Sequence, residues 1–265
     1  MLCATPATAQ AKPTVKSLSF QYKGGVKYAT STFKVDLNHK GGAEKVKVVP
    51  FFKGTRSGAK GLKFYIRGKK ALTVKGKYAS SWFSLHYLRL SKKHEYLLIG
   101  TPTKNAFMVS SVTAYELQKG KLVEVGSLSQ KWGEIGKPTE VTDVLSATAT
   151  SVQVVYSYKK SPLGNHQYKL TYTFDPETNT FTLTSKSASV YFGQSTWTAT
   201  VSAKLYQNAG PASVTNADGT VTKNPVVGKM KKGAKVKKVR VSKDGYVRVT
   251  LKSGKTGWFK WAKYK

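Results

Sequence analysis

The chain has 265 residues, 40% of them hydrophobic, which is enough for two domains with ordinary cores. Lysine and arginine number 45 against 12 aspartate and glutamate residues, so the net charge is +33. Five of the 45 cations are arginine and the other 40 are lysine, a flexible point charge poorly suited to reading bases. The composition therefore argues against sequence-specific nucleic-acid recognition and favours diffuse attraction to an anionic polymer. A lysine bias that serves only solubility is the alternative.

Residues 1–11 are small and mildly apolar, and they end in Ala9-Gln10-Ala11 before Lys12-Pro13. An Ala-x-Ala triplet is typical of a signal-peptidase site, so we expect residues 1–11 to be the remnant of an export signal and the protein to be secreted. A small-residue N-terminus without a targeting role is the alternative. Cys3 is the only cysteine, which excludes an intrachain disulfide, and it lacks the lipobox of a lipid anchor. No later apolar run approaches the roughly 20 residues of a membrane span.

Residues 12–190 contain one alternating apolar pattern after another. Clear examples are Phe33-Lys34-Val35, Leu62-Lys63-Phe64 and Tyr168-Lys169-Leu170. No stretch keeps the 3.6-residue period of an amphipathic helix for long. This region is therefore predicted to be an all-β domain.

A weak internal repeat of roughly fifty residues divides this domain into three units. The units run over residues 33–74, 83–128 and 141–184, and each closes on a predicted hairpin, at 66–72, 116–123 and 175–180. Each unit has room for about four strands, the size of one propeller blade. Propellers typically have about 4–8 blades, so an incomplete propeller and a β-sandwich are both left open.

The first two units open on related segments. Residues 35–48, beginning Val35-Asp36-Leu37-Asn38-His39, resemble the Asp-x-Asp/Asn-x-Asp-Gly loop of calcium-binding propeller blades of the integrin-like and VCBS type. Residues 87–98 resemble a further degenerated copy. Calcium takes about six to eight oxygen ligands, and here His39 and Lys40 stand among the oxygen-bearing residues. We therefore expect no metal, with Asp36 and Asn38 hydrogen-bonding turn amides instead.

The last forty residues carry the most specific pattern. Val247, Val249 and Leu251 alternate with polar residues, as in a half-buried antiparallel strand. Asp244-Gly245 predicts the hairpin before that strand and Ser253-Gly254 the one after it. Gly257 predicts a close passage of the backbone beneath a neighbouring strand. Short strands joined by tight turns favour closure into a small barrel, which removes exposed edges.

On these residues the C-terminal part resembles a bacterial SH3 domain. The resemblance rests on Val227-Gly228, the lysine-rich turn at 230–236 and the run Gly254-Lys255-Thr256-Gly257-Trp258. Residues 191–265 are then a linker and an SH3-like barrel, with 203–206 as its first strand. Secreted proteins of Gram-positive bacteria often join propeller blades to such a module, and the resemblance implies attachment to the cell wall.

Two sets of residues are candidates for binding. Aromatic side chains could line a groove of the SH3-like module for a glycan or peptide: Tyr206, Tyr246, Trp258 and Trp261. Lysines of its turns could attract a polyanion: Lys231, Lys232, Lys235 and Lys255. Since Phe259 and Trp261 share parity along the strand, Trp258 is the exposed candidate if Phe259 points inward.

No segment carries recognisable reaction chemistry. The four histidines are far apart, and no Gly-x-Ser-x-Gly elbow occurs. We therefore predict no catalytic residues, metal or cofactor, and a non-enzymatic secreted or wall-associated protein that binds peptidoglycan, teichoic acid or another anionic polymer. One alternative is a wall- or glycan-targeted hydrolase or its accessory subunit, for which Asp36, Glu95 and Asp143 are the carboxylates to test. Nucleic-acid or polyphosphate binding is the third possibility.

Overall fold

The computed structural model describes residues 12–19, 30–52, 59–76, 83–101, 109, 111–137, 140–158, 166–192 and 196–261, except for the side chains of residues 142, 158, 166, 192 and 238. Within these ranges the chain forms antiparallel sheets and one 3-10 turn, Gly133–Ile135, and it contains no α-helix. The all-β prediction is confirmed. No helix of the described ranges is long and apolar enough to cross a membrane. The expected signal remnant, residues 1–11, lies outside them.

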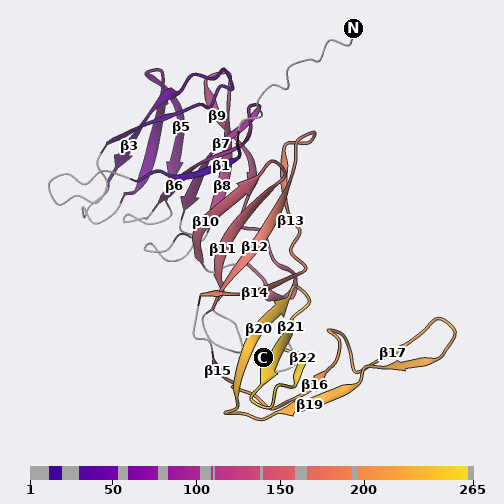
Figure 1. Cartoon of the computed structure of the whole chain (residues 1–265). Coiled ribbons are helices and arrows are strands. Elements are labelled where there is room, and N and C mark those ends of the chain that lie inside the picture. The colour runs from indigo at the N-terminus through magenta and orange to yellow at the C-terminus, as the bar shows by residue number, and fades with distance from the viewer. Residues whose placement is uncertain are drawn as a thin grey trace, which may run out of the picture. The chain divides into compact units, whose positions relative to one another are not determined.

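Three four-stranded meanders follow one another along the chain (Figure 1). The first consists of β2 (Ser31–Val35), β3 (Glu44–Phe51), β4 (Gly61–Ile66) and β5 (Lys69–Lys75). The second consists of β6 (Ser84–Ser91), β7 (His94–Thr101), β8 (Ser111–Gln118) and β9 (Lys121–Ser127), with β1 (Thr14–Ser17) added beside β6. The third consists of β10 (Glu140–Thr148), β11 (Ser151–Tyr158), β12 (His166–Asp175) and β13 (Thr180–Leu183). Each of the three predicted repeats, 33–74, 83–128 and 141–184, thus contains four strands.

Each meander has the tight hairpin that the sequence predicts. Arg67 and Gly68 between β4 and β5 have φ of 51° and 78°, and Lys119 and Gly120 between β8 and β9 have φ of 47° and 81°. Two successive residues with positive φ turn the chain in the sense that suits the right-handed twist of paired strands. The third hairpin, between β12 and β13, places Asn179 at φ 55°.

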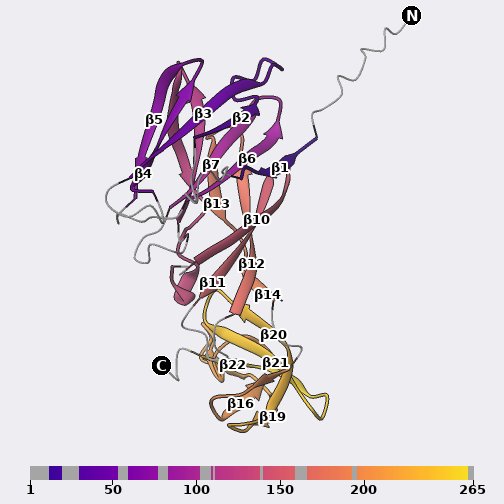
Figure 2. The same cartoon turned by 90° about the vertical axis from the view of Figure 1, so that its left-hand side faces the viewer.

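Strand β7 of the second sheet is buried on both faces. Leu97 and Ile99, each 1% exposed, belong to one hydrophobic core with buried residues of β3 and β4. Figures 1 and 2 show the sheet of β3, β4 and β5 alongside β6 and β7. Tyr96 alternates to the opposite face, where its ring centroid lies 5.8 Å from that of Phe174 and 5.5 Å from that of Phe181. Burial on both sides explains why residues 96–99 form an uninterrupted apolar run.

The chain divides into two compact units. Unit 1 comprises Met1–Leu128, Val144–Gln153 and Tyr172–Thr182, and unit 2 comprises Ser129–Asp143, Val154–Thr171 and Leu183–Lys265. The division passes through strands β10, β11 and β12. The boundary expected near residue 190 remains a prediction.

The sheet of unit 2 continues from β12 in the order β14, β20, β21, β22, β16 and β19. These strands are β14 (Ser187–Phe192), β20 (Lys235–Ser242), β21 (Tyr246–Leu251), β22 (Thr256–Lys260), β16 (Ala203–Tyr206) and β19 (Val226–Met230). The short β15 (Trp197–Thr198) also pairs with β20. In Figure 1 the two-stranded hairpin of β17 (Ser213–Thr215) and β18 (Val221–Lys223) extends away from β16 and β19.

Strand β21 confirms the predicted alternation. Val247 and Val249 are fully buried, whereas Arg248 between them is exposed. Gly245 and Gly254, at φ 77° and 83°, form the two predicted turns. The expected closed barrel does not form among the described residues, because the strands run in the order β20, β21, β22, β16 and β19, and β19 does not pair back with β20 there.

Candidate functional site

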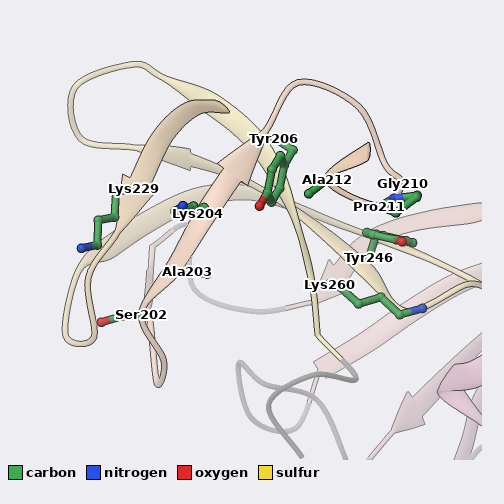
Figure 3. Close-up of a pocket in the computed structure, with 10 residues that line it drawn as sticks. All are labelled: Ser202, Ala203, Lys204, Tyr206, Gly210, Pro211, Ala212, Lys229, Tyr246 and Lys260. Carbon is green, nitrogen blue, oxygen red and sulfur yellow. The ribbon is translucent and has the colours of Figure 1, made fainter. Parts of the chain in front are cut away.

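One face of the β16–β22–β21 sheet is buried inside unit 2. Leu205, Val247 and Phe259 on these three strands are at most 1% exposed. Because successive side chains of a strand point to opposite faces, the residues between them lie on the other side of the sheet. That side forms a groove of about 720 Å³, lined by Ser202, Ala203, Lys204, Tyr206, Gly210, Pro211, Ala212, Lys229, Tyr246 and Lys260 (Figure 3).

Two tyrosines from distant parts of the sequence line this groove. Tyr206 is the last residue of β16 and Tyr246 the first of β21, and both are half-buried. Burial raises the pKa of the Tyr246 phenol, and the nearby carboxylates of Asp244 and Glu134 raise this pKa further. The phenol is therefore neutral at physiological pH, and its hydroxyl can both donate and accept a hydrogen bond.

The charge of the groove is positive. None of its ten lining residues is acidic, and three of them are lysines. Lys204 and Lys229 are direct partners across β16 and β19, so their side chains leave the same face of the sheet. Like charges directly opposite one another destabilise a strand pair, and an anion bound between them would relieve that repulsion.

The third lysine is held in place. Nζ of Lys260 lies 4.6 Å from the ring centroid of Tyr246, its partner across β21 and β22. The same atom lies 3.6 Å from Oε2 of Glu134 and donates a hydrogen bond to the backbone carbonyl of Asp244. Figure 3 shows Lys260 and Lys229 toward opposite ends of the groove, with Tyr206 between them.

The wall formed by residues 210–212 is fixed by one side chain outside the groove. Asn224 Nδ2 donates to the carbonyl oxygens of Asn208, at 2.9 Å, and of Pro211, at 3.3 Å. Its Oδ1 accepts from the backbone N–H of Asn208 at 3.1 Å. Asn224 therefore holds Asn208 and Pro211 at a fixed distance from each other.

The pairing of β16 with β22 depends on a close backbone approach at Gly257. A Cβ atom at this position would lie 2.7 Å from Cγ2 of Val227 and 2.8 Å from Cβ of Leu205. Only a residue without a side chain allows β16 to pair with β22 at this spacing. The predicted passage beneath a neighbouring strand is confirmed.

The structure brings together two of the four predicted aromatic residues. Tyr206 and Tyr246 line the groove. Trp258 is half-buried and pairs with Tyr206 across β16 and β22, but it is not among the lining residues. Trp261 is only 7% exposed, because it shares the parity of the buried Phe259 and lies with the core.

The predicted turn lysines lie outside the groove. Lys231, Lys232, Lys235 and Lys255 are all exposed, and Lys235 Nζ donates to Oγ1 of Thr198 at 2.7 Å. The groove uses Lys204, Lys229 and Lys260 instead. Strand parity could have identified Lys204, since it alternates with the buried Ala203 and Leu205.

The degenerate calcium loop in unit 1 is partly as expected. Asn38 Oδ1 accepts from the backbone N–H of Lys40 at 2.9 Å, whereas Oδ1 of Asp36 is buried and has no hydrogen-bond partner among the described residues. No group of three or more His, Cys, Asp and Glu residues that could hold a metal ion occurs in the described part of the chain. Of the carboxylates chosen to test a hydrolase, Asp36 and Glu95 line one pocket of unit 1, while Asp143 belongs to unit 2.

Comparison of the chain with protein-family models, curated protein sequences and solved structures finds no match.

Proposed function

We propose that this is a non-enzymatic, secreted binding protein of the cell envelope whose C-terminal SH3-like module holds an anionic wall glycopolymer. The single observation that carries the proposal is the groove lined by Tyr206, Tyr246 and the opposed Lys204 and Lys229. We also propose that residues 1–11 are the remnant of an export signal. The module is proposed to be SH3-like, and the repeats are proposed to be propeller-like.

The chemistry of the groove suits a chain of sugars that carries carboxylate or phosphate groups. Tyrosine offers a flat apolar ring for the face of a sugar and a hydroxyl for its edge. Lysines placed along the groove offer point charges for successive anions. The volume of about 720 Å³ falls within the roughly 300–1,000 Å³ typical of sites that enclose a small ligand or one repeat of a polymer.

Sedimentation with Gram-positive cell walls tests the proposal. The full chain is mixed with walls, before and after teichoic acids are stripped, across a salt series. We expect Tyr206→Ala and Tyr246→Ala each to weaken retention by about tenfold, the effect of losing one aromatic contact worth 1–2 kcal/mol. Tyr191→Ala is the matched control, because this tyrosine is 38% exposed on β14 and does not line the groove.

The two wall preparations separate the possible polymers. Retention on stripped walls identifies peptidoglycan as the ligand, and loss on stripping identifies teichoic acid. Tyrosine variants that sediment like the wild type on both preparations would overturn the assignment of the groove.

Binding through charge alone is the second candidate, favoured by the exposed lysines outside the groove: Lys231, Lys232, Lys235 and Lys255. It predicts that affinity falls linearly in a log–log plot against salt, for walls and for nucleic acid alike. It also predicts that Tyr206→Ala and Tyr246→Ala bind as tightly as the wild type, which distinguishes it from groove binding.

A further inference from the structure

Unit 1 contains a second pocket, of about 640 Å³. It lies where β1, the segment after β2 and the β6–β7 hairpin come together. Strand β1 pairs with β6, which brings residues 14–17 beside residues 86–89. The pocket has no residue in common with the groove of unit 2.

Five cations surround this pocket: Lys16, Lys34, Lys40, Arg89 and Lys92. The four lysines are exposed, and Arg89 is partly buried with its side chain 36% exposed. Asp36 and Glu95 are the only acidic residues among those that line it. The rim is therefore strongly positive, and the negative charge is confined to two side chains.

The floor is a hydrogen-bonded network centred on Glu95, a residue that is only 1% exposed. Its Oε1 accepts from the hydroxyl of Tyr87 at 2.6 Å and lies 3.3 Å from Nε of Arg89. Its Oε2 lies 3.3 Å from Nδ1 of His39. Burial raises the pKa of Glu95, and the negative charge of Asp36 adds to this rise, so the two carboxylates are close enough to repel each other. The partners on three sides hold Glu95 in one position.

Three atoms of this network are buried without a hydrogen-bond partner among the described residues: Oδ1 of Asp36, Nε2 of His39 and Nε of Arg89. Asp36 is the one acceptor among them. Its Oδ1 is buried but accepts no hydrogen bond from any residue that the structure describes. A buried acceptor without a donor costs free energy, and so does its repulsion with Glu95. The side chain therefore weakens the folded state while it faces a pocket that a ligand could fill.

We propose that this pocket binds a small hydroxylated anion, a polyol phosphate, with a hydroxyl of the polyol donating to the carboxylate of Asp36 and the phosphate held by the lysines of the rim. A hydroxyl supplies the donor that Asp36 lacks. A phosphate needs the positive charge that the rim provides, and lysine is a common point-charge partner of phosphate. Neither half of the ligand alone satisfies both parts of the pocket.

Calorimetric titration of the full chain with glycerol phosphate, inorganic phosphate and glucuronate at low ionic strength tests the proposal. Asp36→Ala should weaken glycerol phosphate binding by about 10- to 100-fold, the effect of losing a hydrogen bond to a charged group. The same change should leave inorganic phosphate binding unchanged or tighter, since it removes a negative charge from the pocket. Lys92→Gln should weaken both ligands. Glu124→Gln is the matched control, because Glu124 is an exposed acid of unit 1 outside the pocket.

The proposal is supported if Asp36→Ala lowers the affinity for glycerol phosphate while it leaves the affinity for inorganic phosphate unchanged or raises it. Equal tightening of both by Asp36→Ala and by Glu124→Gln would show that only bulk charge matters, and would overturn it. No binding of glycerol phosphate by the wild type would also overturn it. Tight binding of glucuronate with the same dependence on Asp36 would replace phosphate by carboxylate as the anion and so refute the phosphate assignment.

The stability of the same variants gives a second, independent measurement. Asp36→Ala should unfold at the same urea concentration as the wild type or at a higher one, because the change removes an unpaired acceptor and a repulsive charge. Reduced binding together with unreduced stability shows that Asp36 acts on the ligand. A clear loss of stability would show that Asp36 supports the fold, and would contradict the proposal. Groove variants of unit 2 should leave glycerol phosphate binding unchanged, so this proposal and the proposed wall binding can fail separately.

Discussion

Replacement of Gly257 by alanine tests whether the close contact of β16 with β22 determines the stability of unit 2. The added Cβ would lie 2.7 Å from Val227 Cγ2, 2.8 Å from Leu205 Cβ and 3.0 Å from the carbonyl oxygen of Tyr206. The contact with a backbone oxygen cannot be relieved by a side-chain rotation, so strand β16 must move. Overpacking of this kind costs about 1–3 kcal/mol. Alanine loses less backbone entropy than glycine when the chain folds, which offsets about 0.5–1 kcal/mol of that cost. We expect a net loss of about 1–2 kcal/mol in the free energy of unfolding.

Gly228 on the adjacent strand β19 provides the control. A Cβ at this position would meet Leu251 Cδ1 and Lys255 Cδ at 3.7 Å, which is ordinary van der Waals contact. Gly228→Ala therefore keeps the entropic gain without the overpacking, and should raise the free energy of unfolding by about 0.5–1 kcal/mol.

The measurement is equilibrium urea unfolding of both variants, followed by tryptophan fluorescence. A change of midpoint without a change of slope reports stability alone. We expect the free energy of unfolding to be highest for Gly228→Ala, intermediate for the wild type and lowest for Gly257→Ala. If Gly257→Ala were as stable as Gly228→Ala, the close contact would have no energetic importance and the argument would be refuted.

Three further changes test other contacts. Trp132→Phe removes the hydrogen bond from Nε1 to the carbonyl of Ser185, 2.7 Å long and made by a side chain that is 1% exposed, and should lower the free energy of unfolding by about 1–3 kcal/mol in the same urea assay. Asn224→Ala removes the acceptor of the Asn208 N–H and should speed hydrogen exchange at that amide by about tenfold, while exchange in β21 stays unchanged. Burial lowers the pKa of His94 below its ordinary value of 6.5, so the unfolded chain takes up a proton more readily and stability falls as the pH drops below 6.5. His94→Phe should remove that part of the loss between about pH 7.5 and 5.5, and an unchanged loss in the variant would contradict the assignment.

Hairpins and strand faces could be predicted from the sequence because they depend on neighbours along the chain. Gly245 and Gly254 form their predicted turns at positive φ, a conformation that costs glycine nothing. The alternation of Val247 and Val249 with Arg248 follows from the two-residue period of a strand. The three four-strand repeats follow from the same alternation of residues and the same turns.

The candidate site could be predicted only in part. Tyr206 and Tyr246 are two of the four aromatic residues predicted to line a groove, and both line it. Lys229 was not identified, because its position opposite Lys204 depends on the pairing of β16 with β19. Register between strands distant in sequence is set by packing and by loop geometry, which a local pattern does not contain.

The sequence by itself determined that the chain is all-β, where its tight turns lie and which face of a strand enters the core. The tertiary structure alone decided that the sheet of unit 2 is open within the described residues, that three lysines share a groove with two tyrosines, and that Asp36 and Glu95 line one pocket. The physical reason is one of range. Backbone conformation and side-chain alternation are fixed over a few residues, whereas the meeting of two charges from separate strands depends on how whole sheets pair and pack.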